Sequence, residues 1–234
     1  MLILAFETTA KAGSVALLED GKLLAESYQN TGLTHSQTLM VLAEDMLKAA
    51  GKTMADVNAV AVAEGPGSFT GVRIGVAAAK GLAWGAELPC YGVSTLESMA
   101  LTLGAYQGYV CPVMDARRSQ VYNALFYVNR GIVERVCEDR AMALSDLAGE
   151  LKTLDGPIFL VGDGSNLTYN TLKDAVPELI LPPEHRMHQR ASGAALAAAA
   201  KIAAGDPGDA ASMTPNYLRL SQAERERMEK QKNK

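Results

Sequence analysis

The stretch Glu64-Gly-Pro-Gly-Ser-Phe-Thr-Gly-Val-Arg-Ile-Gly75 joins an apolar run to an unusual helix. Three valines in residues 57–63 predict a buried strand before it. Gly65-Pro66-Gly67 predicts a turn, because neither a helix interior nor a strand interior accepts this sequence. Ser68 is then a candidate N-cap for a helix over residues 69–84. The order strand, glycine-rich turn and helix is typical of an α/β protein.

Small residues recur every four positions in this helix, at Gly71, Gly75 and Ala79. Residues at this spacing share one face of a helix. Each helical glycine costs about 1 kcal/mol relative to alanine, so we expect another backbone to press against this helix.

The glycine-rich turn has two interpretations. A turn of this kind before a helix can hold a phosphate on free backbone N–H groups, or it can simply allow close packing. A P-loop requires a Lys-Ser/Thr pair, which is missing here, and a dinucleotide motif requires a third glycine where this chain has Thr70. The acidic residue about twenty positions later is Glu87, which follows a helix instead of ending a strand. The motif spacings therefore favour a packing turn.

The chain has 234 residues, is 48% hydrophobic and carries a net charge of -4. This length allows one large domain or two small ones. The net negative charge argues against a protein whose own electrostatic field attracts nucleic acid. The cysteines, Cys90, Cys111 and Cys137, lie far apart in apolar runs, which favours buried thiols in a reducing compartment. Without a signal peptide or an apolar run of about 20 residues, we expect a cytoplasmic protein that does not cross a membrane.

The predicted elements follow the same order twice. Strands are expected over residues 2–8, 14–18, 22–29, 57–63 and 90–93, and helices over residues 35–50, 69–84 and from Ser94 or Thr95, where residues 94–98 resemble a capped start. Asp20-Gly21 predicts a hairpin turn between the second and third strands. The second set has strands over residues 109–115, 119–128, 132–140 and 158–161, helices from Ser145 to about Leu151 and over residues 166–175, and a loop over residues 177–183. A helix over residues 191–204 and a charged helix or frayed tail over residues 221–234 complete the chain. The duplicated β-β-β-α-β-α order predicts two similar lobes, which we divide into residues 1–107 and 108–234, with the C-terminal helix free to return to the first lobe.

Residues 64–75 strongly resemble the signature of the bacterial TsaB (YeaZ) family. Other motifs of that family match along nearly the whole chain: Leu4-Ala-Phe-Glu-Thr-Thr9, His35-Ser36, Val93-Ser-Thr-Leu-Glu97, Asp115-Ala-Arg-Arg-Ser-Gln-Val-Tyr122, Gly162-Asp-Gly164 and Pro215-Asn-Tyr-Leu-Arg219. The resemblance implies an actin-like (ASKHA) fold with ribonuclease-H-like lobes, in agreement with the duplicated order.

The resemblance also implies a function. Members of this family take part in forming N6-threonylcarbamoyladenosine at position 37 of tRNAs that read ANN codons. They act as the non-catalytic partner of the catalytic subunit TsaD, together with the ATPase TsaE. The implied partners of this chain are TsaD directly, and TsaE and tRNA through the complex. We expect no cofactor in the isolated chain, and ATP or ADP only at the interface of the complex.

The residues allow a test of whether this chain is itself a catalyst. The catalytic relative holds its metal with a His-x-x-x-His pair, whereas here His35 is followed four residues later by Leu39. His185 and His188 lie in a proline-flanked loop without clustered carboxylates or cysteines. We therefore expect no metal site.

A nucleotide site of the actin-like type is a weaker alternative. Its candidate residues are Glu7, where the family more often has Asp, Asp115, and the glycines Gly162 and Gly164. An actin-like ATPase or phosphotransferase would use Glu7 and Asp115 with Mg²⁺. Arg117 and Arg118 replace the glycines that let a phosphate approach, and they either bind phosphates or pair with acids on a solvated turn. A glycoprotease, an older name for such sequences, has no support from a nucleophile beside a base.

The leading hypothesis is a scaffold that binds the catalytic subunit through two helices. Each of the helices over residues 35–50 and 69–84 has one face committed to its own sheet and a second apolar or small face. The candidate interface residues are Met40, Val41, Gly71, Arg73, Gly75, Ala78 and Ala79. We expect Arg73 to pair with Glu44, with Asp45 or with an acid of the partner. Without the partner, the same surface can form a homodimer.

Overall fold

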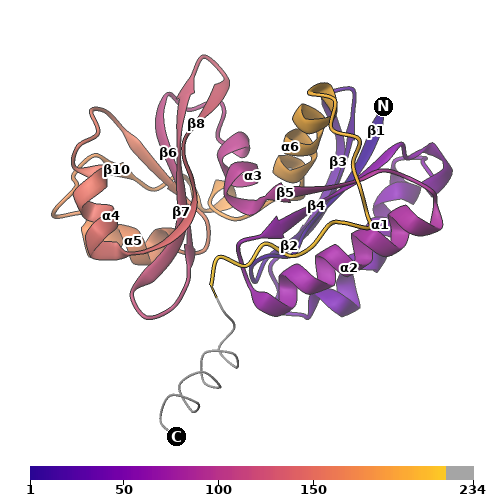
Figure 1. The fold of residues 1–234 in the computed structure, drawn as a ribbon, viewed down its shortest axis with the longest axis horizontal. Coiled ribbons are helices and arrows are strands. Elements are labelled where there is room, and N and C mark those ends of the chain that lie inside the picture. Colours follow the sequence, from indigo (N-terminus) through magenta and orange to yellow (C-terminus); the bar gives the residue numbers. More distant parts are fainter. Residues whose placement is uncertain (220–234) are drawn as a thin grey trace, which may run out of the picture.

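The computed structural model describes residues 1–219 and shows two lobes, each built on a five-stranded sheet (Figure 1). The tail predicted over residues 221–234 lies outside the described residues. The mixed α/β architecture with two similar sheets confirms the predicted duplication.

The first sheet has the strand order β3-β2-β1-β4-β5. Its strands are β1 (Leu2–Glu7), β2 (Gly13–Glu19), β3 (Lys22–Gln29), β4 (Ala59–Gly65) and β5 (Cys90–Ser94). The first three strands are antiparallel, and β4 and β5 continue the sheet in parallel. The predicted hairpin turn at Asp20 and Gly21 is present, with φ of 48° and 81°, a conformation that Asp-Gly adopts readily.

The second sheet repeats this arrangement in the order β10-β9-β6-β7-β8. Its strands are β6 (Gly108–Asp115), β7 (Gln120–Asn129), β8 (Ile132–Ala143), β9 (Ile158–Val161) and β10 (Leu179–Ile180). The prediction of a loop over residues 177–183 was wrong at β10. Two residues are too few for a strand pattern to appear in sequence, and this strand exists because it pairs with β9.

Six α-helices connect and cover the sheets in the part of the chain that the structure describes. They are α1 (His35–Ala49), α2 (Phe69–Gly85), α3 (Thr95–Thr102), α4 (Leu144–Leu151), α5 (Ser165–Leu172) and α6 (Ala191–Ala203), with short 3₁₀ turns η1 (Met54–Asp56) and η2 (Glu184–Arg186). Both predicted caps are confirmed, because the hydroxyl of Ser68 accepts the N–H of Gly71 and that of Ser94 accepts the N–H of Glu97.

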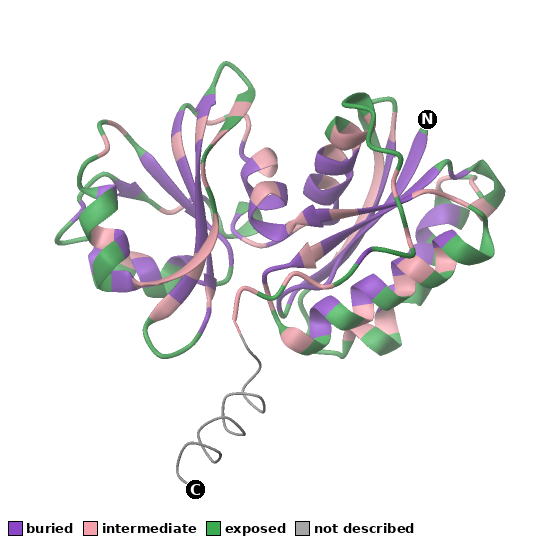
Figure 2. Ribbon diagram, viewed as in Figure 1, coloured by how far each residue is buried: buried purple, intermediate pink, exposed green. Residues whose placement is uncertain are grey.

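Alternating side chains divide each sheet between two cores, and burial is concentrated along the strands (Figure 2). In β1, Leu4 and Phe6 face α1 and α2, whereas Ile3 and Ala5 face α6. The second sheet is covered by α3 on one face and by α4 and α5 on the other. Helix α6, although it follows the second sheet in sequence, therefore packs on the first sheet, and α3 packs on the second. The two helices also contact each other between the sheets.

The stripe of small residues on α2 faces inward. Gly71, Gly75 and Ala79 are buried, and a Cβ at Gly71 or Gly75 would overlap Thr8 at the end of β1. The expectation that a backbone presses against this helix is therefore confirmed. The backbone belongs to the same lobe, however, so these three residues do not form the outward face assigned to them from sequence.

Candidate functional site

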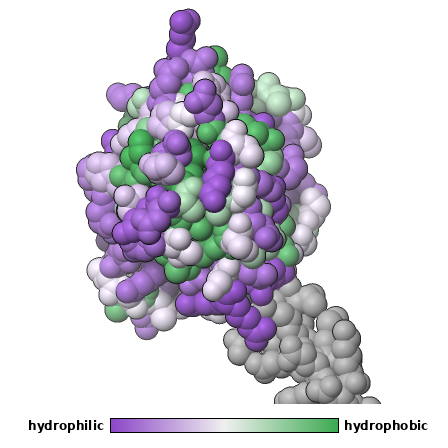
Figure 3. All heavy atoms as spheres, turned by 90° about the vertical axis from the view of Figure 1, so that its left-hand side faces the viewer, coloured by the Kyte–Doolittle hydropathy of each residue, from purple (hydrophilic) through white to green (hydrophobic). Residues whose placement is uncertain are grey.

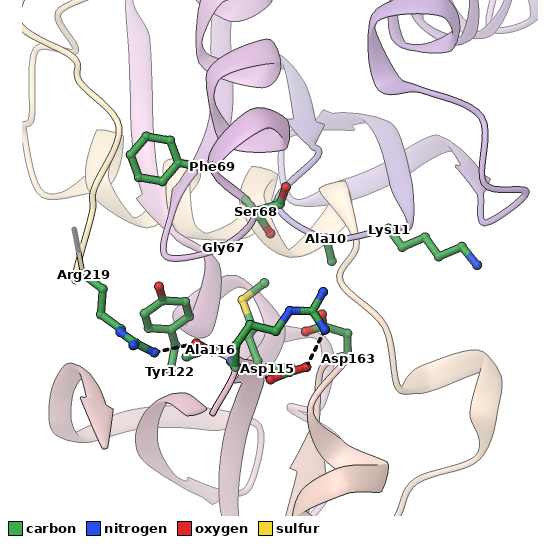
Figure 4. A pocket seen from close by; sticks show the side chains of 13 residues that line it. Ala10, Lys11, Gly67, Ser68, Phe69, Asp115, Ala116, Tyr122, Asp163 and Arg219 are labelled. Carbon is green, nitrogen blue, oxygen red and sulfur yellow. Dashed lines mark hydrogen bonds and ion pairs between the residues drawn. The ribbon is translucent and has the colours of Figure 1, made fainter. Parts of the chain in front are cut away.

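A cavity of about 450 Å³ lies between the two lobes (Figure 4). The loop after β1, the start of α2, the end of β6 and the loop after β9 all contribute to it. This topology brings the candidate Asp115 together with Asp163, which sequence reasoning did not single out. In the close-up, Asp115 and Asp163 lie next to each other, while the side chain of Lys11 extends away from them.

Glu7, at the end of β1, is fully buried beside this cavity. Its Oε1 accepts the backbone N–H and the hydroxyl of Thr9, both at 2.6 Å, whereas its Oε2 has no hydrogen-bond partner among the described residues. Burial raises the pKa of Glu7 to about 7. Burial also raises the pKa of Asp163, although Gln189 donates to its carboxylate at 3.2 Å. The charge of Asp163 raises the pKa of Glu7 further, and the charge of Asp115 raises that of Asp163.

The turn after β6 differs from one that would cradle phosphates. The carboxylate of Asp115 accepts the backbone N–H of Arg117 at 2.7 Å and forms an ion pair with its guanidinium at 3.2 Å. Arg117, Arg118 and Ser119 all have φ between 54° and 66°, in the left-handed region. The carboxylate of Asp115 and the backbone N–H of Arg117 are thus hydrogen-bonded to each other within the turn. This confirms the interpretation in which Arg117 pairs with an acid on a turn.

Gly162 and Gly164 are explained by close packing on β6. A Cβ on Gly162 would overlap the carbonyl oxygen of Val113, and one on Gly164 would lie 3.0 Å from the same oxygen. The N–H of Gly164 donates to that oxygen at 3.1 Å. Both glycines therefore serve the contact of the loop with its own sheet. With Asp115 paired as well, the residues present do not fit a Mg²⁺ nucleotide held in the usual actin-like way.

The second candidate site is the outer surface of α1 and α2. Met40 and Val41 are 44% and 56% exposed on α1, and Trp84 is 75% exposed on α2. On α2, Ala78 is half-buried against the core, whereas Ala77 and Gly81 are exposed. The outward part of the predicted interface therefore consists of Met40, Val41 and Arg73, and the structure adds Ala77, Gly81 and Trp84.

Arg73 has a different neighbour from the one expected. Its Nε donates to the hydroxyl of Tyr217 at 2.8 Å, and its guanidinium lies 4.5 Å from the centre of the Phe69 ring. The rings of Phe69 and Tyr217 are stacked with 4.0 Å between their centres. The predicted pairing with Glu44 or Asp45 was wrong, because Glu44 pairs with Lys48 and the aromatic pair attracts the cation instead.

Tyr217 belongs to the C-terminal strap, residues 206–219, which runs from α6 across the first lobe towards the junction of the lobes (Figure 1). At its end, the guanidinium of Arg219 donates to the carbonyl oxygen of Ala116 in the second lobe. Sequence reasoning quoted Tyr217 and Arg219 only as part of a motif. Their roles depend on contacts with residues more than 100 positions away, which no local pattern reveals.

The histidines and cysteines have structural environments. His35 Nε2 hydrogen-bonds the carbonyl oxygen of Ala10 at 2.8 Å, and His188 pairs with Glu184 at 3.0 Å. Within residues 1–219, His, Cys, Asp and Glu side chains form no group of three or more suited to a metal. Burial raises the pKa of the thiols of Cys90 and Cys111 to about 12, so both thiols stay protonated and unreactive. No helix in the described part of the chain is long and apolar enough to span a bilayer.

The two sheets of matching topology, joined at an interlobe cavity, define a two-lobed protein of the actin-like class. Fold comparison supports this class, because ROK hexokinase from Thermus thermophilus matches with a TM-score of 0.51 at 12% identity, over 88% of this chain and 100% of that one. A more similar structure is YeaZ from Pseudomonas aeruginosa, with a TM-score of 0.77 and 28% identity over 93% of this chain and 99% of that one.

Sequence comparison is more specific. The family model described as TsaD, tRNA N6-adenosine threonylcarbamoyltransferase, matches residues 28–226. The tRNA threonylcarbamoyladenosine biosynthesis protein TsaB of Bacillus subtilis is 34% identical over 99% of this chain and 100% of its own length. The chain therefore belongs to the TsaB family, within the wider group that the TsaD model describes.

Proposed function

We propose that this chain is the non-catalytic, activating subunit of the assembly that forms N6-threonylcarbamoyladenosine at position 37 of tRNAs reading ANN codons. The observation that carries the proposal is the full-length match to a TsaB protein. Its direct partner is a TsaD-type catalytic subunit, and TsaE and tRNA are reached through the complex. ATP or ADP, if it takes part, binds at the interface of the complex.

The interlobe cavity supports a non-catalytic role. Asp115 is engaged by Arg117, and the glycines of the loop after β9 pack on β6 instead of facing the cavity. The other candidate carboxylate, Glu7, is completely buried and is not among the side chains that line the cavity. These features favour a scaffold over the alternative ATPase or phosphotransferase.

The outer surface of α1 and α2 supports a protein partner. Exposed apolar side chains gather there, at Met40, Val41 and Trp84, beside the small residues Ala77 and Gly81. On the outer face of the second lobe, hydrophobic and hydrophilic side chains are interspersed (Figure 3). The two helices of a related actin-like subunit would complete a four-helix contact in which small residues permit close approach. A second copy of the chain can use the same surface when the partner is absent.

A reconstitution tests the proposal. The pure chain, a TsaD-type subunit and TsaE are combined with an activated threonylcarbamoyl donor and an ANN-decoding tRNA, and the modified nucleoside is quantified. We expect strong formation with all components and loss of formation when this chain is omitted. Sedimentation should show a complex with the TsaD-type subunit. Steady ATP turnover by the chain alone, abolished by Glu7→Gln, would instead establish the phosphotransferase alternative.

A further inference from the structure

A second cavity, of about 610 Å³, lies in the first lobe beneath the C-terminal strap. It is bounded by the ends of β4 and β5, by the end of α6 and by the strap itself. It shares none of its lining residues with the interlobe cavity. The proposed function assigns it no role.

Two charged groups of opposite sign approach Gly92 of β5 in this cavity. The carboxylate of Glu64 occupies the space where a side chain on Gly92 would begin, so any other residue at position 92 would displace it. The Lys201 ammonium donates to the carbonyl oxygen of Gly92 at 2.6 Å. A glycine inside a strand is destabilising unless another group needs the room, and here that group is a carboxylate.

Glu64 and Lys201 are close without being paired. Burial raises the pKa of Glu64, and the positive charge of Lys201 lowers it by a smaller amount. Within residues 1–219, no ion pair joins the two side chains. The carboxylate of Glu64 accepts no hydrogen bond from any described residue. The Lys201 ammonium has three N–H groups, and only the one that binds Gly92 has a protein acceptor in the described chain.

The other acids of this cavity are already used by the strap. Asp206 accepts the N–H of Gly208 at 2.9 Å, and Asp209 accepts the N–H groups of Ala211 and Ser212 at 2.7 and 3.2 Å. Glu64 differs from them in that its carboxylate holds no part of the strap. Its own backbone carbonyl accepts the N–H of Asn216 at 2.7 Å, which fixes the strap beside it.

We propose that this cavity binds a small zwitterion of the α-amino acid class, with its ammonium group at Glu64 and its carboxylate at Lys201. A carboxylate and an ammonium that are partly buried and do not pair with each other can each bind an opposite charge, and a single zwitterion supplies both. Thr214 lines the same cavity and suits a polar side chain of the ligand. This inference does not depend on the proposed function in tRNA modification.

Calorimetric titration of the full chain with glycine and with L-serine tests the proposal. We expect saturable binding, with a dissociation constant at or below about 1 mM, whereas methylammonium and acetate, which each carry half of the charge pair, bind at least tenfold more weakly. Binding of methylammonium as tight as that of glycine would overturn the zwitterion assignment, and no binding of either amino acid would overturn the site. These titrations need no variant.

Two variants then locate the binding. Glu64→Gln keeps the shape of the side chain and removes its charge, and Lys201→Met removes the ammonium, so each should weaken glycine binding at least tenfold. The matched control is Glu44→Gln, which removes an exposed carboxylate from α1 and should leave the affinity unchanged. Circular dichroism and melting confirm that each variant is folded. Unchanged affinity in folded Glu64→Gln would contradict the proposal.

Discussion

The hydroxyl of Thr8 donates to the carbonyl oxygen of Gly71 at 2.8 Å, while the carbonyl oxygen of Thr8 lies where a side chain on Gly71 would begin. The end of β1 is thus fastened to the first turn of α2 by a hydrogen bond and by direct backbone contact. Because Thr8 and Thr9 lead into the interlobe cavity, this contact also fixes one wall of the cavity relative to the helix that carries the proposed partner surface.

Replacing a buried and an exposed glycine of α2 should have opposite effects on stability. A Cβ on Gly71 overlaps the backbone of Thr8, which cannot move without disturbing β1, so Gly71→Ala should reduce the free energy of unfolding by about 2 kcal/mol or more. A Cβ on Gly81 would point into open space, with no neighbouring atom within 4 Å, so Gly81→Ala should raise the free energy of unfolding by about 0.5–1 kcal/mol through helix propensity. Urea denaturation of both variants measures the difference, and equal effects would contradict the inward orientation of Gly71.

The buried carboxyl group of Glu7 should make stability depend on pH. Its pKa is about 7 in the folded protein and 4.5 when unperturbed, a difference of about 2.5 units. Because the folded pKa is the higher one, the stabilisation is complete below about pH 4.5 and is lost as the pH rises through 7. The full loss corresponds to about 3 kcal/mol.

The variant Glu7→Gln isolates this effect. Its side-chain oxygen can still accept from Thr9, but the group no longer ionises, so the free energy of unfolding should fall less between pH 5 and pH 8 than in the parent. Glu64, whose pKa is also raised, is present in both proteins and cancels in the comparison, whereas the part of the difference that comes from Asp163 reflects its coupling to Glu7. Parallel stability profiles for parent and variant would show that Glu7 does not titrate in this range.

The sequence predicted what depends on local pattern and on a duplicated order. The caps at Ser68 and Ser94, the Asp20-Gly21 turn and the strand β1 all follow from neighbouring residues, and the structure confirms each of them. The direction of the Gly71 stripe was assigned wrongly, because small residues permit close packing on either side of a helix and the pattern does not say which.

Contacts between distant segments could not be predicted. Arg135 on β8 pairs with Asp139 at 2.7 Å and reaches Glu97 on α3 at 3.3 Å, while Ser94 donates to the same Asp139, so this cluster ties the end of the first lobe to the second. Tyr217 reaches Arg73 across 144 positions in the same way. The folded chain determines which distant residues come into contact. The sequence alone shows only that a buried charge requires some partner.

Arg73 should contribute to partner binding through its planar guanidinium. Arg73→Lys keeps the charge but loses the planar guanidinium and its stacking on Phe69. The affinity for the TsaD-type subunit should therefore fall at least fivefold, while the free energy of unfolding changes by less than about 1 kcal/mol. The matched control is Arg186→Lys, at an exposed arginine in η2. If Arg73→Lys binds the subunit as tightly as the parent and supports full tRNA modification, Arg73 only holds the strap.

The exposed apolar side chains of α1 provide the most direct test of the proposed interface. Val41 is 56% exposed, so Val41→Glu places a charge at the surface without disturbing the core, and Ala77→Glu does the same on α2. Ala78 is less suited to this change, because it packs partly against the core. If the helices of the catalytic subunit cover this surface, the new carboxylate loses its water without gaining a partner, and the affinity should fall at least tenfold, or by about 1.4 kcal/mol.

The matched control for this test is Val136→Glu, because Val136 is 51% exposed on β8 of the second lobe. It introduces the same chemical change at a similar exposure and should leave the affinity unchanged. Sedimentation with the TsaD-type subunit gives the affinities, and melting curves verify that all three variants remain folded. Sedimentation of each variant alone shows whether a homodimer uses the same surface. Parental affinity in folded Val41→Glu and Ala77→Glu would place the partner elsewhere on the molecule, and a loss in Val136→Glu alone would move it to the second lobe.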